Sequence, residues 1–263
     1  MLRDITIGQY YPADSPVHSL DPRTKILASL MMIIALFVIS PLWGYSIPLV
    51  LLAVIIRLSR VPFKFIVKGL RPIMFFMIFA VGINVFLTPG EIAFEIWFLK
   101  ASYEGLYRAA ITLCRFSFLI VTSSLVTLTT SPMALTDGIE RLLNPLKVIK
   151  FPAHELAMMM TIALRFIPTL IEEGDKIMKA QMARGADFES GSLFTRAKNM
   201  VPLLVPLFIG AFRRADDLAM AMEARCYRGG LGRTRMNQLK MKVRDGLVLG
   251  LAMIYMITMI IVL

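Results

Sequence analysis

A run of 31 residues without a single charge, Ile26–Ile56, sets the first limit on what this chain can fold into. A helix that crosses a bilayer needs about 20 residues, so one helix of this length is too long for a single span. Pro41, Gly44 and Pro48 supply a break that divides the run into two spans joined by a very short turn. Hydrophobic residues make up 57% of the 263 residues and charged residues only 18%, which exceeds the apolar content of a soluble domain. The chain is therefore predicted to be an integral membrane protein.

The distribution of charge predicts three more spans and an orientation. Apolar segments follow at about Ile73–Leu87, Ala109–Thr130 and Leu247–Leu263. The loop before the third span is basic and holds no acid, which is typical of cytoplasmic loops; its basic residues are Arg57, Arg60, Lys64, Lys68 and Arg71. The loop Pro89–Arg108 is poor in basic residues and is predicted to face outward. Residues 1–130 thus form an N-terminal membrane region of about four spans, residues 247–263 form a fifth span, and the N-terminus lies in the cytoplasm.

The polar residues near these spans suggest no metal site and no disulfide. The net charge of +11 fits loops that face anionic lipid, and no basic run with interleaved aromatics indicates nucleic-acid binding. His18 and His154 lie far apart and favour hydrogen bonding over metal binding, and Cys114 and Cys226 are not expected to pair.

Arg115, near the start of the fourth span, leaves two interpretations open: a functional intramembrane charge, or a side chain that reaches the headgroups.

Residues 131–246 differ from the spans and predict cytoplasmic helices. A short helix is expected from Ser131 to about Leu143, because Ser131 is a good N-cap and Pro132 fits the first turn. An apolar stripe at helical spacing predicts a second helix from near Pro152 to Arg184, with Gly185 at its end. A third helix is expected from about Pro202 to Arg225. None of the apolar stretches in this segment is long enough on its own to span a membrane.

Two patterns mark the candidate site. In the third helix Ala211, Ala215 and Ala219 recur every four residues, which favours a close helix crossing, although helix propensity alone would also explain alanine. The two long helices also end alike, in an alanine, an arginine and a third residue that is small: Ala183, Arg184, Gly185 and Ala224, Arg225, Cys226. An arginine at a helix C-terminus complements the helix dipole, so a structural role is the alternative to a binding role.

Two further patterns argue against catalysis by this chain. The glycine cluster Gly229–Thr234 lacks the spacing and the lysine of a phosphate-binding loop and is interpreted as a basic loop. Asp216 and Asp217 might suggest paired carboxylates, but Arg213 and Arg214 offer salt-bridge partners on the same helix. No catalytic residue is therefore predicted.

Nearly the whole chain resembles the transmembrane (T) component of energy-coupling factor transporters. The resemblance is carried by four features: the stretch His18–Lys25 before the first span, Lys68–Pro72, the two alanine-arginine triplets, and the block Arg213–Gly230. The family often has glycine after the second arginine, whereas this chain has Cys226. This departure puts the geometry of that loop in question more than the family membership.

The resemblance implies an all-α, L-shaped membrane protein with about five transmembrane helices and long cytoplasmic amphipathic coupling helices. It implies a coupling subunit of an ATP-driven importer in a prokaryotic cell membrane, one that catalyses nothing and binds no cofactor itself. Its expected partners are two ABC ATPase subunits, which bind ATP, and a small membrane S component, which selects a vitamin or trace metal ion. Arg184 and Arg225 would each dock one ATPase subunit.

Two other classes of function stay open from the residues alone. A membrane-embedded enzyme acting on a lipid would need several acids or histidines at one membrane depth, and the spans hold almost none. A self-contained secondary transporter or channel would favour charged residues inside spans and internal repeats. Arg115 alone is a weak basis for that interpretation.

Overall fold

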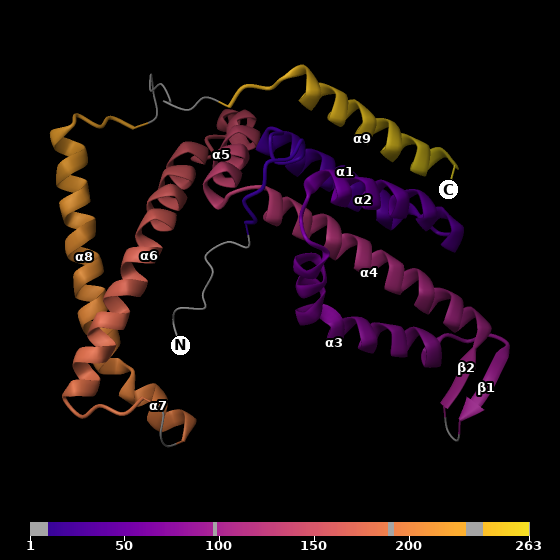
Figure 1. Ribbon diagram of the computed structural model, residues 1–263, viewed down its shortest axis with the longest axis horizontal. Coiled ribbons are helices and arrows are strands. Elements are labelled where there is room, and N and C mark those ends of the chain that lie inside the picture. The colour runs from indigo at the N-terminus through magenta and orange to yellow at the C-terminus, as the bar shows by residue number, and fades with distance from the viewer. Residues whose placement is uncertain (1–9, 97–98, 189–191, 230–238, 263) are drawn as a thin grey trace. The chain divides into compact units, whose positions relative to one another are not determined.

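The computed structural model describes residues 10–96, 99–188, 192–229 and 239–262, and most of them are helical, as predicted (Figure 1). The chain divides into two compact units. Among the described residues, the terminal unit contains those from 10 to 142 and from 239 to 262, and the middle unit contains those from 143 to 229. The predicted cytoplasmic segment, residues 131–246, is wider than the middle unit. It also takes in the helix before residue 143 and residues 239–246, both of which pack in the terminal unit.

The terminal unit contains six helices in the described residues: α1 (Pro22–Val38), α2 (Ser46–Ser59), α3 (Phe63–Leu87), α4 (Tyr103–Thr129), α5 (Pro132–Leu143) and α9 (Val243–Val262). A short 3₁₀ turn, η2 (Leu42–Tyr45), separates α1 from α2 at the predicted break. Asp21 caps α1 by accepting a hydrogen bond from the Arg23 backbone N–H, and Ser102 caps α4 in the same way. These caps explain why both helices begin ahead of their charge-free segments.

The helix α3 begins well before the predicted start at Ile73. Lys64, Lys68 and Arg71, which sequence reasoning placed in a loop, lie within α3. Long basic side chains at the end of a membrane helix can extend toward the headgroups, so charge does not end the helix. The predicted outer loop contains a short antiparallel hairpin, in which β1 (Ile92–Ile96) pairs with β2 (Leu99–Ser102). No strand was predicted there from the sequence.

Five helical segments in the described part of the chain are long and apolar enough to cross a membrane: Leu42–Ser59, Phe63–Leu87, Tyr103–Thr129, Ala153–Ala183 and Val243–Ile261. Their number agrees with the prediction, but their membership differs. The helix α1, with 17 residues, is missing from this set, and Ala153–Ala183 of the middle unit joins it. The expectation that no segment of the middle unit could span therefore fails on length and composition alone.

Small residues let α3 and α4 pack closely. A Cβ added to Gly69 would lie 2.8 Å from the Ser124 Oγ, and one added to Gly105 would lie 2.7 Å from the Asn84 carbonyl oxygen. The apolar core of the unit draws on four helices and the loop after α2, with Met32, Leu52, Val61, Ile66, Leu125 and Leu128 buried together. Close backbone approach of this kind is typical of helices packed in a membrane.

Arg115 makes contacts within the terminal unit that neither sequence interpretation included, and both interpretations stay predictions. Its Nε donates a hydrogen bond to the Tyr45 hydroxyl at 3.0 Å, and its Nη2 donates to the Ile39 carbonyl at 2.9 Å. The guanidinium also lies over the Phe37 ring, 5.7 Å from its centroid. Arg115 therefore satisfies a carbonyl at the C-terminal end of α1 and ties α4 to the turn between α1 and α2.

The middle unit contains the predicted long helices, α6 (Ala153–Ala183) and α8 (Val201–Ala224), with the 3₁₀ turn η3 (Asn144–Ile149) before them and the short helix α7 (Leu193–Asn199) between them. The two long helices pack against each other and run in opposite directions (Figure 1). Their bounds agree closely with the expected ones, and both continue through an internal proline, Pro168 and Pro206. This antiparallel pair carries the candidate site.

Candidate functional site

The end of α6 is closed by a Schellman motif around the first triplet. The Ala186 N–H donates to the Gln181 carbonyl, and the Gly185 N–H donates to the Met182 carbonyl, both at 3.0 Å. Gly185 has a φ of +89°, in the left-handed region that this motif requires. Arg184 is thus the C-cap residue, and the backbone turns away directly after it.

The end of α8 repeats this geometry residue by residue. The Tyr227 N–H donates to the Met222 carbonyl at 3.0 Å, and the Cys226 N–H donates to the Glu223 carbonyl at 2.8 Å. Cys226 has a φ of +55°, although it is not glycine. Arg225 is the C-cap residue here, as Arg184 is in α6. The repeated triplet therefore encodes two copies of one helix end, and the departure at Cys226 does not change the turn.

Both arginines are exposed, but the structure does not bring them together. The end of α8 lies beside the first turns of α6, because Met158, Thr161 and Ile162 line a cavity with Arg225 and the residues after it. Arg184 ends α6 at the other end of this antiparallel pair. The two triplets thus present two separate exposed arginines, Arg184 and Arg225, each with its flanking alanine and third residue also exposed.

The two helices cross at an ion pair that sequence reasoning did not identify. The Arg214 Nη1 of α8 lies 2.6 Å from the Glu173 Oε2 of α6, and both contacting atoms are shielded from solvent although the two side chains are partly exposed. Gly210 leaves room for this carboxylate, because a Cβ there would lie 3.0 Å from the Glu173 Oε1. The sequence had suggested that Arg214 pairs with an acid of its own helix.

The ion pair lies midway between the two arginine tips. Arg184 follows Glu173 by eleven residues along α6, and Arg225 follows Arg214 by eleven residues along α8. At 1.5 Å per residue, each tip is about 16 Å from the crossing along its own helix axis. A displacement of either tip therefore acts on the crossing through an arm of the same length.

The predicted alanine ridge is not the face of α8 that meets α6. Ala211 is half-buried, whereas Ala215 and Ala219 are exposed. The face toward α6 is the neighbouring stripe, with Leu203, Leu207, Gly210, Arg214, Leu218 and Met222 all at least partly buried. The rule of small residues at every fourth position does not distinguish adjacent stripes of one helix. The close helix crossing predicted for Ala211, Ala215 and Ala219 stays a prediction.

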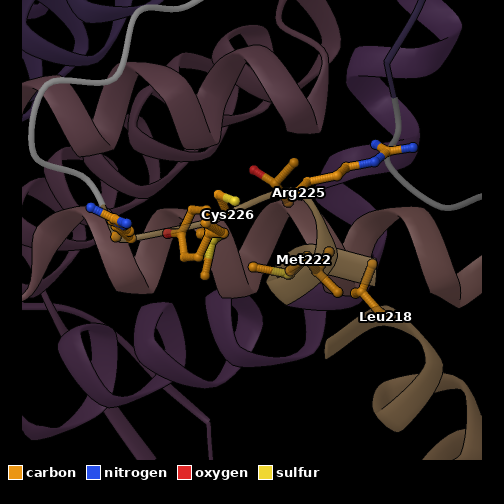
Figure 2. A pocket seen from close by; sticks show the side chains of 10 residues that line it. Leu218, Met222, Arg225 and Cys226 are labelled. Atoms are coloured by element: carbon orange, nitrogen blue, oxygen red, sulfur yellow. The ribbon is translucent and has the colours of Figure 1, made fainter. Parts of the chain in front are cut away.

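A cavity of about 530 Å³ opens between the first turns of α6 and the end of α8. Its floor is apolar, and Figure 2 shows Leu218 and Met222 along the last turns of α8, followed by Arg225 and Cys226. Arg228 also lines it. The cavity thus places an arginine tip at the rim of an apolar groove. Of the predicted glycine-rich loop, residues 230–234 lie outside the described part of the chain.

The exposed surface of α8 is strongly apolar over its first half, whereas its second half also exposes Asp216 beside Met220. Phe208, Phe212 and Met220 are each 60–69% exposed, and Leu204 and Ile209 are also open to the surroundings. In water such a face would be unfavourable, so lipid or another protein must cover it in the assembled state.

Comparison with known proteins decides the family. A model of the family described as "Cobalt transport protein" (CbiQ) matches residues 13–237. The chain belongs to this family. It is 55% identical over 256 residues to the "Energy-coupling factor transporter transmembrane protein EcfT" of Ruminiclostridium cellulolyticum, covering 97% of this chain and 96% of that protein. The protein of the same name from Thermosediminibacter oceani is 58% identical over 93% of this chain and 92% of that protein. The one from Bacillus subtilis is 48% identical over 93% of each chain.

Membership of the CbiQ family confirms the resemblance drawn from the triplets and from the block Arg213–Gly230. The chain is a multi-pass transmembrane component of an energy-coupling factor transporter. In this CbiQ-family protein the two matching arginines are the C-cap residues of the two longest helices of the middle unit. Sequence reasoning missed Glu173 and Gly210, because nothing in a single helix shows which partner residue it crosses.

Proposed function

We propose that this chain is the coupling subunit of an ATP-driven importer of the energy-coupling factor type. It transmits the motion of two ABC ATPase subunits to a small membrane S component, which selects a vitamin or trace metal ion. ATP is bound by the ATPase subunits, and the chain itself is a non-catalytic subunit without a cofactor.

The observation that carries the proposal is the pair of matching helix ends. Arg184 and Arg225 are exposed C-cap residues on two Schellman motifs with the same hydrogen bonds. The planar guanidinium can hold a carboxylate through two parallel hydrogen bonds, which a docking point for a partner needs. Because the two tips lie at opposite ends of an antiparallel pair, each suits a separate ATPase subunit. The central crossing joins their motions.

The exposed face of α8 supports a second contact of the same unit. Its phenylalanine and methionine side chains suit a membrane partner whose contact surface changes during a transport cycle, because methionine adapts to irregular surfaces. We assign this face to the S component. Residues 131–246 and the N-terminus lie in the cytoplasm in this proposal, where the ATPase subunits are.

The test is co-purification of the ATPase subunits with tagged chain in mild detergent. Arg184→Ala or Arg225→Ala should each weaken binding, because a partner carboxylate left unpaired in a buried contact costs about 2–5 kcal/mol. The double variant should lose the ATPases, since two docking points on one rigid pair act with a high effective concentration. Lysine at either position should rescue only in part.

Arg213→Ala is the matched control, because Arg213 is exposed on the same helix but is not a C-cap residue. It should leave assembly unchanged. If the double alanine variant still assembles and transports as the wild type does, the arginines only complement the helix dipoles and the coupling role assigned to them is wrong. Failure to recover any ATPase or S component with the wild-type chain would favour an enzyme or a self-contained transporter.

A further inference from the structure

A buried polar cluster joins the start of α1 to the start of α9, where Asp245 lies in the first turn. Asp21 and Asp245 are 6% and 2% exposed. The Asp245 Oδ1 accepts a hydrogen bond from the Asp21 backbone N–H, and its Oδ2 accepts one from the Lys242 backbone N–H, both at 2.8 Å. A buried carboxylate is stable only when hydrogen bonds or opposite charges compensate it. Asp245 thus fixes two backbone segments that are more than 200 residues apart in sequence.

Arg23 and Lys25 complete this cluster. The Arg23 guanidinium donates to the Asp21 carboxylate at 2.9 and 3.0 Å and also contacts the Leu239 carbonyl at 3.4 Å. The Lys25 Nζ donates to the carbonyl of Thr129, the last residue of α4, at 2.8 Å, and to the His18 carbonyl at 3.2 Å. We call Asp21, Arg23, Lys25 and Asp245 the hub.

The helix α5 is seated against the same place. A Cβ added to Gly138 of α5 would lie 3.0 Å from the Pro22 Cβ and 3.4 Å from the Arg23 backbone nitrogen. A side chain at this position would make a tight contact that requires α1 or α5 to shift by a few tenths of an ångström. Burial raises the pKa of Asp21, but the hydrogen bonds and charge of Arg23, with a smaller contribution from Arg141 of α5, lower it overall.

The hub lies next to both places where the chain passes between the two units. In the described part of the chain, the terminal unit passes into the middle unit after residue 142 and resumes at residue 239, and these two places are the junctions of the two units. Gly138 and Arg141 lie just before the first junction, and Leu239, Lys242 and Asp245 lie just after the second. The hub therefore holds the chain on the membrane side of both junctions.

We propose that the hub is the anchor through which the motion of α6 and α8 reaches the membrane helices, which makes Asp21, Arg23 and Asp245 positioning residues for transport. A connecting segment transmits a displacement only when its far end is held, because otherwise the segment itself deforms. The proposal rests on the coupling function proposed above. It assigns a role to the stretch His18–Lys25, which the docking of ATPases does not explain.

A purely structural role would lower the yield of folded complex and every activity in proportion. An anchor would instead separate two responses: the middle unit should still respond to ATP, and the terminal unit should not. Hydrogen exchange in the purified complex with its ATPase subunits, with and without Mg-ATP, measures both responses and needs no knowledge of the transported substrate.

The test compares Asp245→Ala and Arg23→Lys with wild type. Asp245→Ala removes the two carboxylate oxygens that accept from the Asp21 and Lys242 backbone N–H groups. Arg23→Lys keeps the positive charge but loses the paired hydrogen bonds to the Asp21 carboxylate and the contact with the Leu239 carbonyl. Both should keep the bound ATPases, ATP hydrolysis and the ATP-dependent exchange change in α6 and α8. The ATP-dependent change in α1 and α4 should fall by more than half. Asp14→Ala and Arg57→Lys are controls at exposed positions of the same unit and should behave as wild type.

The outcomes are decisive in either direction. A wild-type response of α1 and α4 in the hub variants would overturn the proposal, and so would a proportional loss in both units. If Asp245→Ala fails to assemble, Arg23→Lys decides alone. Failure of the coupling function itself looks different: the wild-type middle unit would then show no response to ATP, or no ATPase would co-purify.

Discussion

The third residue of each arginine triplet illustrates how backbone conformation restricts side-chain choice. Gly185 meets the left-handed requirement of the Schellman motif without strain, and Cys226 meets it at a cost. A left-handed conformation costs a residue with a side chain about 1–2 kcal/mol, and glycine avoids this cost. Glycine in turn loses about 0.5–1 kcal/mol more conformational entropy on folding, which offsets part of the difference.

Cys226→Gly should therefore stabilise the chain, by up to about 1 kcal/mol. Ala224→Gly is the matched control, because Ala224 is helical and glycine there should destabilise by up to about 1 kcal/mol. Thermal unfolding followed by circular dichroism in detergent should show midpoint shifts of opposite sign. Equal decreases would mean that Cys226 is not held in the left-handed conformation.

Lys25 should make stability depend on alkaline pH. It lies just before the predicted span that begins at Ile26, and burial lowers the pKa of its ammonium to about 8, although the charges of Asp245 and Asp21 oppose the shift. The unfolded chain, with the ordinary pKa of 10.5, then binds more protons than the folded chain between these values. Stability from this group is therefore gained as pH rises from about 8 to 10.5 and lost as pH falls back to 8.

Lys25→Met tests this expectation, because it removes the titrating group and keeps an unbranched side chain. The midpoint of thermal unfolding of the wild type, minus that of Lys25→Met, should rise between pH 8 and pH 10.5. A difference that stays flat or falls across this range would show that the pKa of Lys25 is not lowered in the folded chain.

At the scale of elements, the crossing of α6 and α8 depends on one position without a side chain. Gly210 leaves space for the Glu173 carboxylate, which Arg214 holds in place. A methyl group at Gly210 would press on a carboxylate that cannot move freely. Gly174, the neighbour of Glu173 in α6, has no atom within 4 Å of an added Cβ.

Gly174→Ala should stabilise the chain by about 0.5–1 kcal/mol, because alanine favours the helix. Gly210→Ala should lower the unfolding midpoint. The cost of disturbing the ion pair between Glu173 and Arg214 should exceed the gain in helix stability that alanine brings at either position. In a Glu173→Ala background the penalty of Gly210→Ala should disappear, which a double-mutant cycle would measure. The same rise for both glycine variants would place the crossing elsewhere.

The sequence predicts elements better than it predicts their contacts. The breaks at Pro41 and Gly44, the caps at Ser131 and Gly185, and the apolar stripe of α6 are local signals, and the helices end close to them. The crossing of α6 and α8 depends on which stripe of α8 faces α6, where Arg214 pairs with a residue 41 positions earlier, and the alanine spacing carries no information on that partner. Asp245 offered one signal: it is the only acid in the basic stretch between residues 233 and 245, which runs into the first turn of α9.

At the scale of the whole molecule, length and composition do not decide whether α6 crosses the membrane or lies on its cytoplasmic side. The helix as a whole is long and apolar enough for a membrane span. Its second half, however, carries five charges: Glu172, Glu173, Asp175, Lys176 and Lys179. Each charge at the centre of a bilayer costs about 2.5–3.5 kcal/mol on the insertion scale. The ion pair between Glu173 and Arg214 also needs α8, which carries charges of its own, to enter with it.

We therefore expect α6 to stay on the cytoplasmic side and residue 192, which follows it, to be inaccessible from outside the cell. Ser192→Cys tests this with an impermeant thiol reagent in intact cells, because Ser192 is exposed in the chain. Glu91→Cys, in the predicted outer loop, should react before lysis, and Ser192→Cys only after permeabilisation. The native Cys226, exposed at the end of α8, should behave like Ser192→Cys and serves as the internal reference. If α6 crossed the membrane, Ser192→Cys would react in intact cells, and Arg184 would lie on the side away from any ATPase.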